Sequence, residues 1–385
     1  MANKRARVLI VGMLDSIHLA RWLKQFSESE IDFVLFPSTP HRRIHGQIKS
    51  LIKGSSLATY TIVPGMKMLA LPLTIADLFL ANRIRGKILQ LLINKSRYEF
   101  DVIHSHETQH AGYLTEIAIR NSQRKPNHIL SIWGSDLYWF KQFKKHRTKI
   151  QSVLQNTNQL ILECHRDVVL ANELGYKGNE PILISASGGF GVEEIELGSK
   201  SLRTSERKTI LVKGYMGFVG RADVALSAIK EIYAELDGYR VVVYSTDFRT
   251  RRIIDTLKRD TGLAIQSYKK HQLNHTSMLA LFRESRIHIG ISASDGMPGS
   301  LREAMLNGCI PIQSDTSCAN EWFTDKKDGF LVTLNSNSGI VNAIRKCISD
   351  DAWVDRAAIK NRSVAITQLA KISPNDMKAI LYGRS

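Results

Sequence analysis

Short apolar runs alternate with segments of helical spacing along the first half of the chain. ARVLIVG (6–12) and IDFVLFPS (31–38) flank a segment whose apolar residues recur with a helical period. Further apolar runs follow at 100–106, 128–136, 158–165 and 180–187. Strands that are apolar along their whole length are buried on both faces, as in a parallel sheet covered by helices. The pattern therefore predicts an α/β unit.

The same alternation restarts in the second half of the chain and predicts a second α/β unit. Strand-like runs, with helical segments between them, lie at 208–214, 239–245, 286–292 and 310–315. The stretch 187–208, which precedes them, has four glycines, several charges and no periodicity. Such a stretch is typical of an interdomain connection.

The expected organisation is two Rossmann-like domains followed by a short helix. That helix begins with Ser373 as its cap and Pro374 at its first position, where a proline fits best. The expected boundaries are 1–190 for the first domain, 191–207 for the linker, 208–370 for the second domain and 371–385 for the C-terminal helix. A chain of 385 residues is long enough for two domains of this size.

The charge balance indicates an anionic partner. The chain carries a net charge of +17 and has a pI of about 9.7. A basic surface attracts nucleotide phosphates, nucleic acid or an acidic membrane face. The alternative is a surface rich in Lys and Arg that has no specific partner.

The cysteines and the hydropathy of the chain indicate the compartment in which the protein works. The four cysteines are far apart and form no CxxC pair, which favours neither a disulfide framework nor a zinc site and indicates a reducing compartment. The N-terminus is read as a first strand, since its apolar run is too short for a signal sequence. The most apolar window, 66–81, is interrupted by Lys67, Pro72 and Asp77, so it is not expected to cross a membrane, although its composition is compatible with a membrane surface.

The loop that follows the strand at 286–292 suggests an anion-binding site. Gly296 and Gly299 allow the backbone to approach a ligand closely. Ser300 is expected to cap the next helix, with Glu303 at capping-box spacing. The amides of a helix start favour an anion such as a diphosphate, and a carboxylate beside it suits a pair of sugar hydroxyls. The alternative is a capped Gly/Pro turn that binds nothing.

Residues 292–332 resemble the donor-site segment of the retaining GT-B glycosyltransferases of family GT4. That family has a Glu-x7-Glu motif, which is matched here by Asp295 and Glu303. The segments RVLIVG, FDVIHSH, SIWGSD and ILVKGYMGFVGRADVALSAI resemble other parts of the family. Three departures are clear. Asp replaces the first Glu, Trp133 stands where a His is usual, and the basic pair is rearranged.

The resemblance implies a GT-B fold, with two Rossmann-like parallel sheets facing across a cleft and a C-terminal helix that returns to the N-domain. It implies transfer of a sugar, with retained configuration, from a nucleotide-diphosphate sugar to a hydroxyl of a glycan or lipid-linked acceptor. The donor is expected to be UDP- or GDP-linked. Neither a metal nor another cofactor is expected. Product anomeric analysis would separate this reading from another GT-B enzyme, either an inverting transferase or a nucleotide-sugar epimerase.

The resemblance also assigns roles to particular residues. His106 and Asp295 are the expected catalytic residues, whereas His104 is expected to be structural. His18 and Asp136 are candidates for the acceptor site or the cleft edge. The residues expected to bind the donor are Gly12, Lys213, Arg221, Asp295, Gly296, Met297, Pro298, Gly299, Ser300, Leu301 and Glu303.

The acceptor is expected to bind the region 38–100 of the first domain, where basic and apolar residues are interleaved. This composition favours an anionic membrane surface, although a solvated basic helix has the same composition. We therefore expect a cytoplasmic protein that associates with the inner face of the cell membrane, within envelope polysaccharide assembly. A basic nucleic-acid-binding α/β protein is an alternative from another class. A nucleic-acid partner is not expected, however, because no RNP-like aromatic motif, zinc spacing or clear helix-turn-helix is present. A dinucleotide-dependent oxidoreductase would need GxGxxG after the first strand, and VGMLDSI lacks it.

Overall fold

The computed structural model describes residues 5–40, 43–54, 56–66, 69, 72–75, 80, 82–95, 99–184, 202–369 and 373–383. The chain divides into two compact units. The first comprises Met1–Gly189 and Ile372–Ser385, and the second comprises Phe190–Lys371. Each unit is built on a parallel sheet, so the expected pair of Rossmann-like domains is confirmed.

In the described part of the first unit, seven parallel strands form one sheet in the order β3-β2-β1-β4-β5-β6-β7. The strands in the middle of the sheet are buried along almost their whole length, as their continuous apolar sequences require. The strands are β1 (Ala6–Gly12), β2 (Ile31–Pro37), β3 (Thr59–Ile62), β4 (Val102–His106), β5 (Asn127–Ser131), β6 (Gln159–Leu162) and β7 (Ile182–Leu183).

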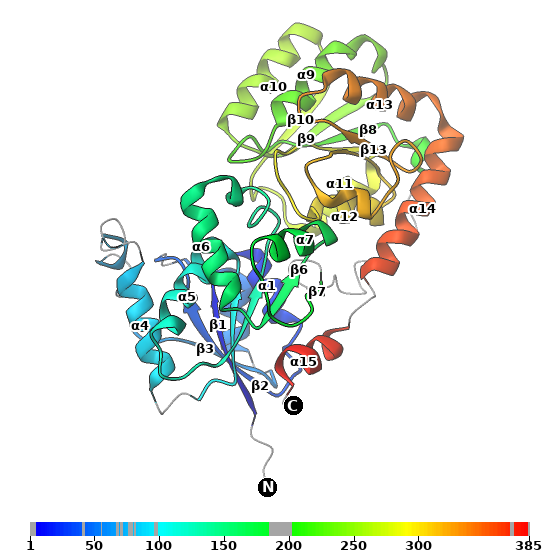
Figure 1. The fold of residues 1–385 in the computed structure, drawn as a ribbon. Coiled ribbons are helices and arrows are strands. Elements are labelled where there is room, and N and C mark those ends of the chain that lie inside the picture. Colours follow the sequence, from blue (N-terminus) through cyan, green and yellow to red (C-terminus); the bar gives the residue numbers. More distant parts are fainter. Residues whose placement is uncertain are drawn as a thin grey trace. The chain divides into compact units, whose positions relative to one another are not determined.

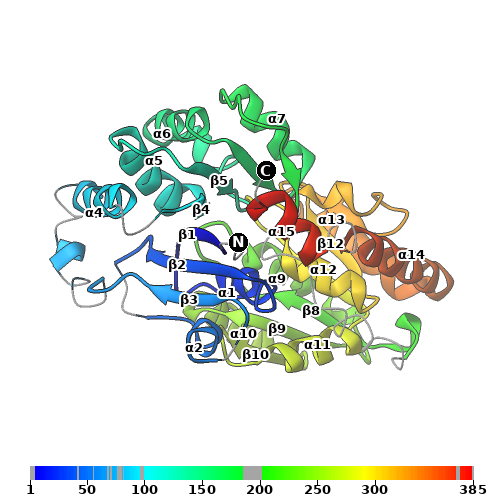
Figure 2. The same ribbon diagram turned by 90° about the horizontal axis from the view of Figure 1, so that it is seen from below.

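Helices cover both faces of this sheet. On one face α1 (Ile17–Lys24), α2 (Gly46–Lys53) and α15 (Pro374–Tyr382) share a core with the strands. The other face is covered by α4 (Arg83–Asn94), α5 (Tyr113–Arg120) and α6 (Lys144–Gln155), and α7 (His165–Glu173) packs beside α6. Figure 2 shows the two layers, with α4, α5 and α6 on the opposite side of the strands from α2. A π-helical turn, η1 (Thr108–Gly112), joins β4 to α5, and a 3-10 turn, η2 (Phe140–Gln142), precedes α6.

The C-terminal helix α15 is part of the first unit, although it follows the second unit in sequence. Ser373 caps it as expected, with its Oγ accepting a hydrogen bond from the amide of Asp376 at 3.1 Å. Met377, Leu381 and Tyr382 lie in the same core as α1 and α2. The last described residues of the chain therefore complete the core formed by the first ones.

In the described part of the second unit, six parallel strands are ordered β10-β9-β8-β11-β12-β13. On one face lie α9 (Ala222–Glu231), α10 (Phe248–Thr261) and α13 (Asn337–Ser349), and on the other α11 (His275–Glu284) and α12 (Gly299–Leu306), as Figure 1 shows. The long helix α14 (Asp351–Leu369) packs against α12 and α13. The strands are β8 (Thr209–Lys213), β9 (Arg240–Thr246), β10 (Ile265–Lys269), β11 (Ile287–Gly290), β12 (Ile310–Ser314) and β13 (Phe330–Val332). Three 3-10 turns, η3 (Thr204–Glu206), η4 (Tyr233–Glu235) and η5 (Cys318–Glu321), complete the unit.

The expected linker, 191–207, lies outside the described residues as far as residue 201. Its last residues pack into the second unit. Thr204 donates a hydrogen bond from Oγ1 to the carbonyl of Gly308 at 2.8 Å, and Ser205 donates from Oγ to Asp355 at 2.8 Å. The second unit therefore includes residues that precede its first strand.

Membrane-spanning helices were not expected, and within the described ranges no helix is both long and apolar enough to cross a bilayer. Much of the window 66–81 lies outside those ranges.

Gly86 allows α4 and α5 to pack closely. A Cβ atom at this position would lie 2.5 Å from Cγ2 and 3.1 Å from Cβ of Ile117 on α5. Only a residue without a side chain fits there unless Ile117 or one of the helices moves.

We predict that Gly86→Ala destabilises the first unit by about 1–2 kcal/mol, because overpacking outweighs the better helix propensity of alanine. Urea unfolding of the full-length protein measures the change. Adding Ile117→Ala should recover part of the loss. Gly46→Ala is the control, since a Cβ at Gly46 meets nothing within 4 Å, and it should be neutral or slightly stabilising. Equal stability of Gly86→Ala and wild type would contradict the close helix contact.

Candidate functional site

In the second unit, two loops that follow neighbouring strands pair with each other. Gly220 forms an antiparallel bridge with Ser292. The amide of Ala293 donates to the carbonyl of Val219 at 2.7 Å, and the amide of Arg221 donates to the carbonyl of Ile291 at 3.0 Å. These backbone bonds place Arg221 beside the loop that leads to Asp295.

Lys213 and Asp295 meet at the ends of β8 and β11. Lys213 Nζ lies 3.7 Å from Asp295 Oδ2, and both side chains are 28% exposed. The other carboxylate oxygen of Asp295 accepts a hydrogen bond from the amide of Gly296 at 3.0 Å. Arg221 donates from Nη1 to the carbonyl of Gly220 at 2.8 Å. The structure thus gathers the two expected cations and the expected acid in one cluster of loops.

The expected capping box at Ser300 is wrong. The N-cap of α12 is Pro298, whose carbonyl accepts from the amides of Leu301 at 3.0 Å and Arg302 at 3.2 Å. Proline holds the extended cap conformation, Gly299 takes the first helical position, and Ser300 therefore lies inside the first turn. The amides of Gly299 and Ser300 remain among the helix-start amides that have no intrahelical acceptor.

One residue of this loop, Met297, and one of the first turn of α12, Leu301, have side chains that lie in the core. Met297 and Leu301 are buried against the aromatic residues Trp322 and Phe323 and the end of α14. Gly296 accepts a hydrogen bond from the amide of Cys318 at 2.9 Å. Met297 and Leu301 were expected to bind the donor, and their buried side chains leave only their backbone for such a contact.

Glu303 has a partner that the sequence did not indicate. Its Oε1 lies 2.9 Å from Nε2 of His275, at the first position of α11. Asn274 caps α11 by accepting from the amide of Ser277 at 2.8 Å. The cap could be read from the sequence, but no spacing links His275 to a carboxylate 28 residues away.

In the first unit, Gly12 and His106 lie side by side at the carboxyl ends of β1 and β4. The two strands pair in parallel, with Val11 opposite Ser105. A Cβ on Gly12 would lie 3.0 Å from Cδ2 of Leu19 on α1 and 3.4 Å from Cβ of His106. Glycine therefore lets α1 start close to the histidine.

His106 is buried among aromatic rings. It is 2% exposed, its ring stacks on that of His104 with centroids 4.1 Å apart, and the ring centroid of Trp22 lies 5.4 Å away. Its Nε2 has no hydrogen-bond partner in the described part of the chain. Burial lowers the pKa of His106 to about 3, so the ring is neutral at physiological pH.

His18 lies on the exposed N-terminal turn of α1, close to Trp133. Its ring centroid is 5.3 Å from that of Trp133, which in turn is 6.4 Å from that of His106. The amide of His18 donates to Oγ of Ser16, the N-cap of α1. Both His18 and His106 therefore lie near the ring of Trp133.

Asp136 points inward and binds backbone amides. Its Oδ2 accepts from the amide of Trp133 at 3.0 Å and from the amide of Thr108 at 2.8 Å. Burial, reinforced by the nearby carboxylate of Glu107, raises the pKa of Asp136 well above its usual range. Glu107 itself has φ 74° and accepts from the amide of His110 at 2.8 Å. Asp136 therefore connects the loops after β4 and β5 and shapes the surroundings of His106.

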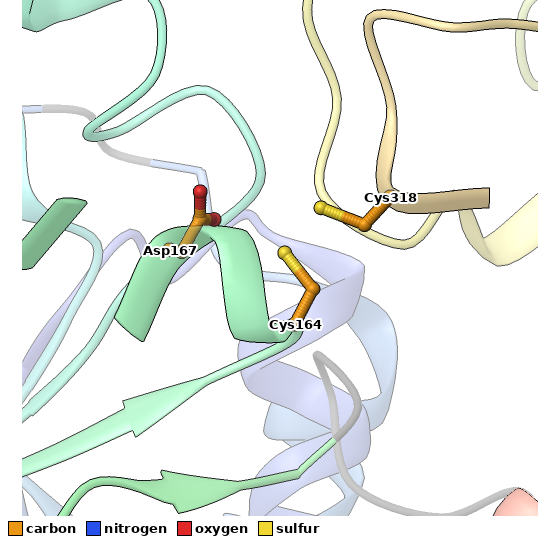
Figure 3. Close-up of side chains that lie close together, drawn as sticks. All are labelled: Cys164, Asp167 and Cys318. Atoms are coloured by element: carbon orange, nitrogen blue, oxygen red, sulfur yellow. The ribbon is translucent and has the colours of Figure 1, made fainter. Parts of the chain in front are cut away.

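The cysteines differ in their surroundings. Cys309 and Cys347 are buried free thiols in the second unit, and burial raises the pKa of Cys309 to about 12. Cys164 is the N-cap of α7, where Asp167 of the first turn accepts a hydrogen bond from Nε of Arg166 at 2.9 Å. Cys318 is the first residue of η5 (Figure 3).

Two family models match the chain. Residues 7–164 match the family described as glycosyl transferase 4-like, and residues 194–364 match the family described as glycosyl transferases group 1. The first match falls within the first unit and the second within the second unit. No curated protein sequence matches the chain significantly.

Similar solved structures include HepE (Alr3699) from Anabaena in complex with UDP and with UDP-glucose. The UDP complex has a TM-score of 0.68 at 14% identity, over 97% of this chain and 98% of that one. An α,α-trehalose-phosphate synthase (UDP-forming) from Burkholderia vietnamiensis has a TM-score of 0.67 at 12% identity, over 98% of this chain and 99% of that one. At these identities the likeness establishes a common fold, in agreement with the two parallel sheets.

We predict that acid destabilises the protein because four buried histidines cannot take up a proton in the folded state. Burial lowers the pKa of His106 and His288 to about 3 and that of His128 to about 4, and it also lowers the pKa of His104. As the pH falls below 6.5, the histidines of the unfolded chain become protonated, so each should cost about 1 kcal/mol of stability by about pH 5.5. The raised pKa values of Asp136 and of His110, which is hydrogen-bonded to Glu107, act in the opposite sense, but they are two groups against four.

Urea unfolding at about pH 7.5 and about pH 5.5 measures this loss. His106→Asn removes one of the four groups and should reduce the loss by about 1 kcal/mol. Equal stability at both pH values would contradict the burial of neutral histidines.

Proposed function

Since the two matched families make the chain a glycosyltransferase of the GT-B fold, we propose that it transfers a sugar with retained configuration from a UDP- or GDP-sugar. The proposed acceptor is a hydroxyl of a glycan or a lipid-linked glycan. The observation that carries this proposal is the cluster of Lys213, Arg221, Asp295 and Glu303 around the start of α12. These residues supply what the donor half of the reaction needs.

The leaving nucleoside diphosphate needs positive charge at its phosphates. Lys213 and Arg221 provide two cations, and the amides at the start of α12 provide hydrogen-bond donors aided by the helix dipole. A guanidinium has five N–H groups, of which the bond to Gly220 uses one. Because protein groups provide this charge, we propose that the transfer needs neither a metal nor another cofactor.

The carboxylates suit the sugar hydroxyls of the donor. Glu303 is proposed to bind the ribose hydroxyls, with His275 holding one of its oxygens. Asp295 is proposed to bind the transferred sugar, oriented by Lys213 and by the amide of Gly296. Asp295 is one methylene shorter than the glutamate of the resembled motif, and its bond to the next amide keeps it close to the backbone.

His106 is proposed to contact the donor sugar near the reacting carbon. Its buried Nε2 has no partner in the described part of the chain, so a sugar hydroxyl would satisfy it. A neutral imidazole can form a hydrogen bond with the sugar hydroxyl without placing a positive charge beside the developing oxocarbenium ion. Gly12 next to it leaves space for a ligand to approach the backbone.

We predict that UDP or GDP raises the unfolding temperature of the protein in the presence of EDTA. A ligand at about 100 times its Kd stabilises the folded state by roughly 2.7 kcal/mol. Arg221→Ala and Glu303→Gln should each weaken binding about 10- to 100-fold, since each removes a hydrogen bond that involves a charged group. Arg259→Ala is the matched control, because Arg259 lies on the exposed surface of α10 in the same unit.

The donor proposal fails if no nucleoside diphosphate shifts the unfolding temperature, or if Arg221→Ala binds like Arg259→Ala. With the effective nucleotide known, NMR of the product's anomeric carbon distinguishes retention from inversion. Strongly salt-dependent binding of nucleic acid without nucleotide binding would indicate a different class of protein.

An outward face of α4 supports a membrane-linked acceptor. Ile84 and Leu91 are 38% and 54% exposed, and the basic residues Arg83, Lys87 and Lys95 are exposed around them. The opposite face of α4 is buried against α5. Apolar side chains among lysines suit the boundary of an anionic bilayer. We propose that the protein works at the inner face of the cell membrane, in polysaccharide biosynthesis for the cell envelope.

We predict that the protein sediments with vesicles containing phosphatidylglycerol and stays in solution with phosphatidylcholine vesicles. Replacing both Ile84 and Leu91 by Ser should weaken vesicle binding about tenfold, because less apolar surface enters the bilayer. Added salt should weaken it further. Ile359→Ser is the control, since Ile359 is 73% exposed on α14 of the second unit. Unchanged vesicle binding by the double variant would rule out this face of α4.

A further inference from the structure

We propose that Tyr382, in the C-terminal helix α15, is a positioning residue for the transfer. Its hydroxyl sets the tautomer of His104 and, through the stack of His104 on His106, the position of the His106 ring. The inference rests on the proposed role of His106 at the donor sugar. Tyr382 on α15 would thus support His106 on β4, although the two residues lie far apart in sequence.

The hydrogen bonds around Tyr382 have one consistent direction. Trp22 donates from Nε1 to the Tyr382 hydroxyl oxygen at 3.1 Å, and an indole nitrogen can only donate. The hydroxyl lies 2.6 Å from Nδ1 of His104. Burial raises the pKa of Tyr382, so the hydroxyl keeps its proton. That proton goes to Nδ1 of His104, because the described residues offer it no other acceptor.

His104 then has only one possible tautomer. Burial and the neighbouring His106 and His128 lower its pKa, so the ring is neutral and carries one N–H group. Since Nδ1 accepts from Tyr382, the proton is on Nε2, which donates to Oγ of Ser131 at 2.8 Å. Four side chains on α1, α15, β4 and β5 thus form one directed chain of hydrogen bonds.

Ring packing links the orientation of His104 to that of His106. The rings of His104 and His106 are stacked with an interplanar angle of 27°. Trp22 packs its ring against both, with centroid distances of 5.3 Å to His104 and 5.4 Å to His106. Tyr382 therefore forms hydrogen bonds with Trp22 and His104, the two residues that pack on His106. Neither hydrogen bond involves His106 itself.

Losing the hydroxyl would leave two buried polar groups without a partner. Nδ1 of His104 and Nε1 of Trp22 would both face the apolar core formed with Met377 and Leu381. The His104 ring could then take either tautomer or rotate, and the stacked His106 ring would no longer have a fixed support. Nε2 of His106 would be less well placed for a sugar hydroxyl, while the donor cluster of the second unit would be unaffected.

The test is Tyr382→Phe in the full-length protein, with Tyr60→Phe as the matched control. Tyr60 is also a buried tyrosine of the first unit, and its hydroxyl donates to the carbonyl of Leu23 at 2.9 Å. Tyr382→Phe should lower kcat about tenfold and change the donor KM by less than about twofold, because positioning is lost but donor binding is kept. Tyr60→Phe should keep kcat.

A second readout does not depend on turnover. Nitrogen-15 NMR of histidine-labelled protein, with His104 assigned through His104→Asn, should show His104 protonated on Nε2 alone in wild type and in Tyr60→Phe. In Tyr382→Phe the two nitrogens should shift toward a mixture of tautomers, and the signals of His106 should move as well.

Two results would overturn the proposal. One is a His104 signal in Tyr382→Phe that is identical to that of wild type. The other is an equal loss of kcat in the two Phe variants, which would mean that only general stability was lost. If wild type transfers no sugar from any donor, the proposed function fails, while the nitrogen spectra still decide whether Tyr382 sets the tautomer of His104.

Discussion

Parallel strand pairing is the constraint on which both candidate sites depend. In each unit the central strands run in one direction, so their carboxyl ends emerge at the same edge of the sheet. The pairing of β1 with β4 places Gly12 beside His106. The neighbouring positions of β8 and β11 bring Lys213 to Asp295. Within each unit the residues involved lie apart in sequence, and the parallel pairing of the strands brings them together.

The two clusters have opposite electrostatic character. The cluster of the first unit is buried, with the neutral imidazoles of His104 and His106 packed beside the ring of Trp22. The cluster of the second unit is half-exposed and contains formal charges and helix-start amides. A sugar transfer needs both environments, since the diphosphate requires charge and the reacting carbon requires shelter from water. Burial of the histidines makes the protein sensitive to acid, whereas the partly exposed ion pair of Lys213 and Asp295 is partly screened by solvent.

The sequence predicted the parts of the fold that have a local cause. The continuous apolar runs of the inner strands predicted those strands. His106, Lys213 and Asp295 were candidates because of the resemblance to a known family, which no local pattern replaces. The missed strands β3, β10 and β13 lie at sheet edges, where strands are short and partly exposed. The capping error at Ser300 arose because a serine at capping-box spacing from Glu303 was preferred to the proline that holds the extended cap.

Contacts made only in three dimensions could not be predicted. His275 reaches Glu303 from another helix, and Met297 and Leu301 turn out to face the core of the second unit. Tyr382 meets Trp22 across 360 residues of sequence. Nothing in the spacing or composition of these residues indicates a partner, since each pairing depends on how helices pack on a sheet.

The position of α15 has a consequence for biosynthesis. Its residues Met377, Leu381 and Tyr382 fill the core between α1, α2 and the sheet, and Tyr382 contacts the rings of Phe26 and Phe33. A ribosome makes these residues after the whole second unit. Domains generally fold in order from the N-terminus during synthesis. Until α15 is made, however, the core of the first unit is incomplete and its aromatic rings are exposed. Translation that stops before α15 would yield a first unit whose open core and exposed aromatic rings chaperones and proteases can recognise as unfolded.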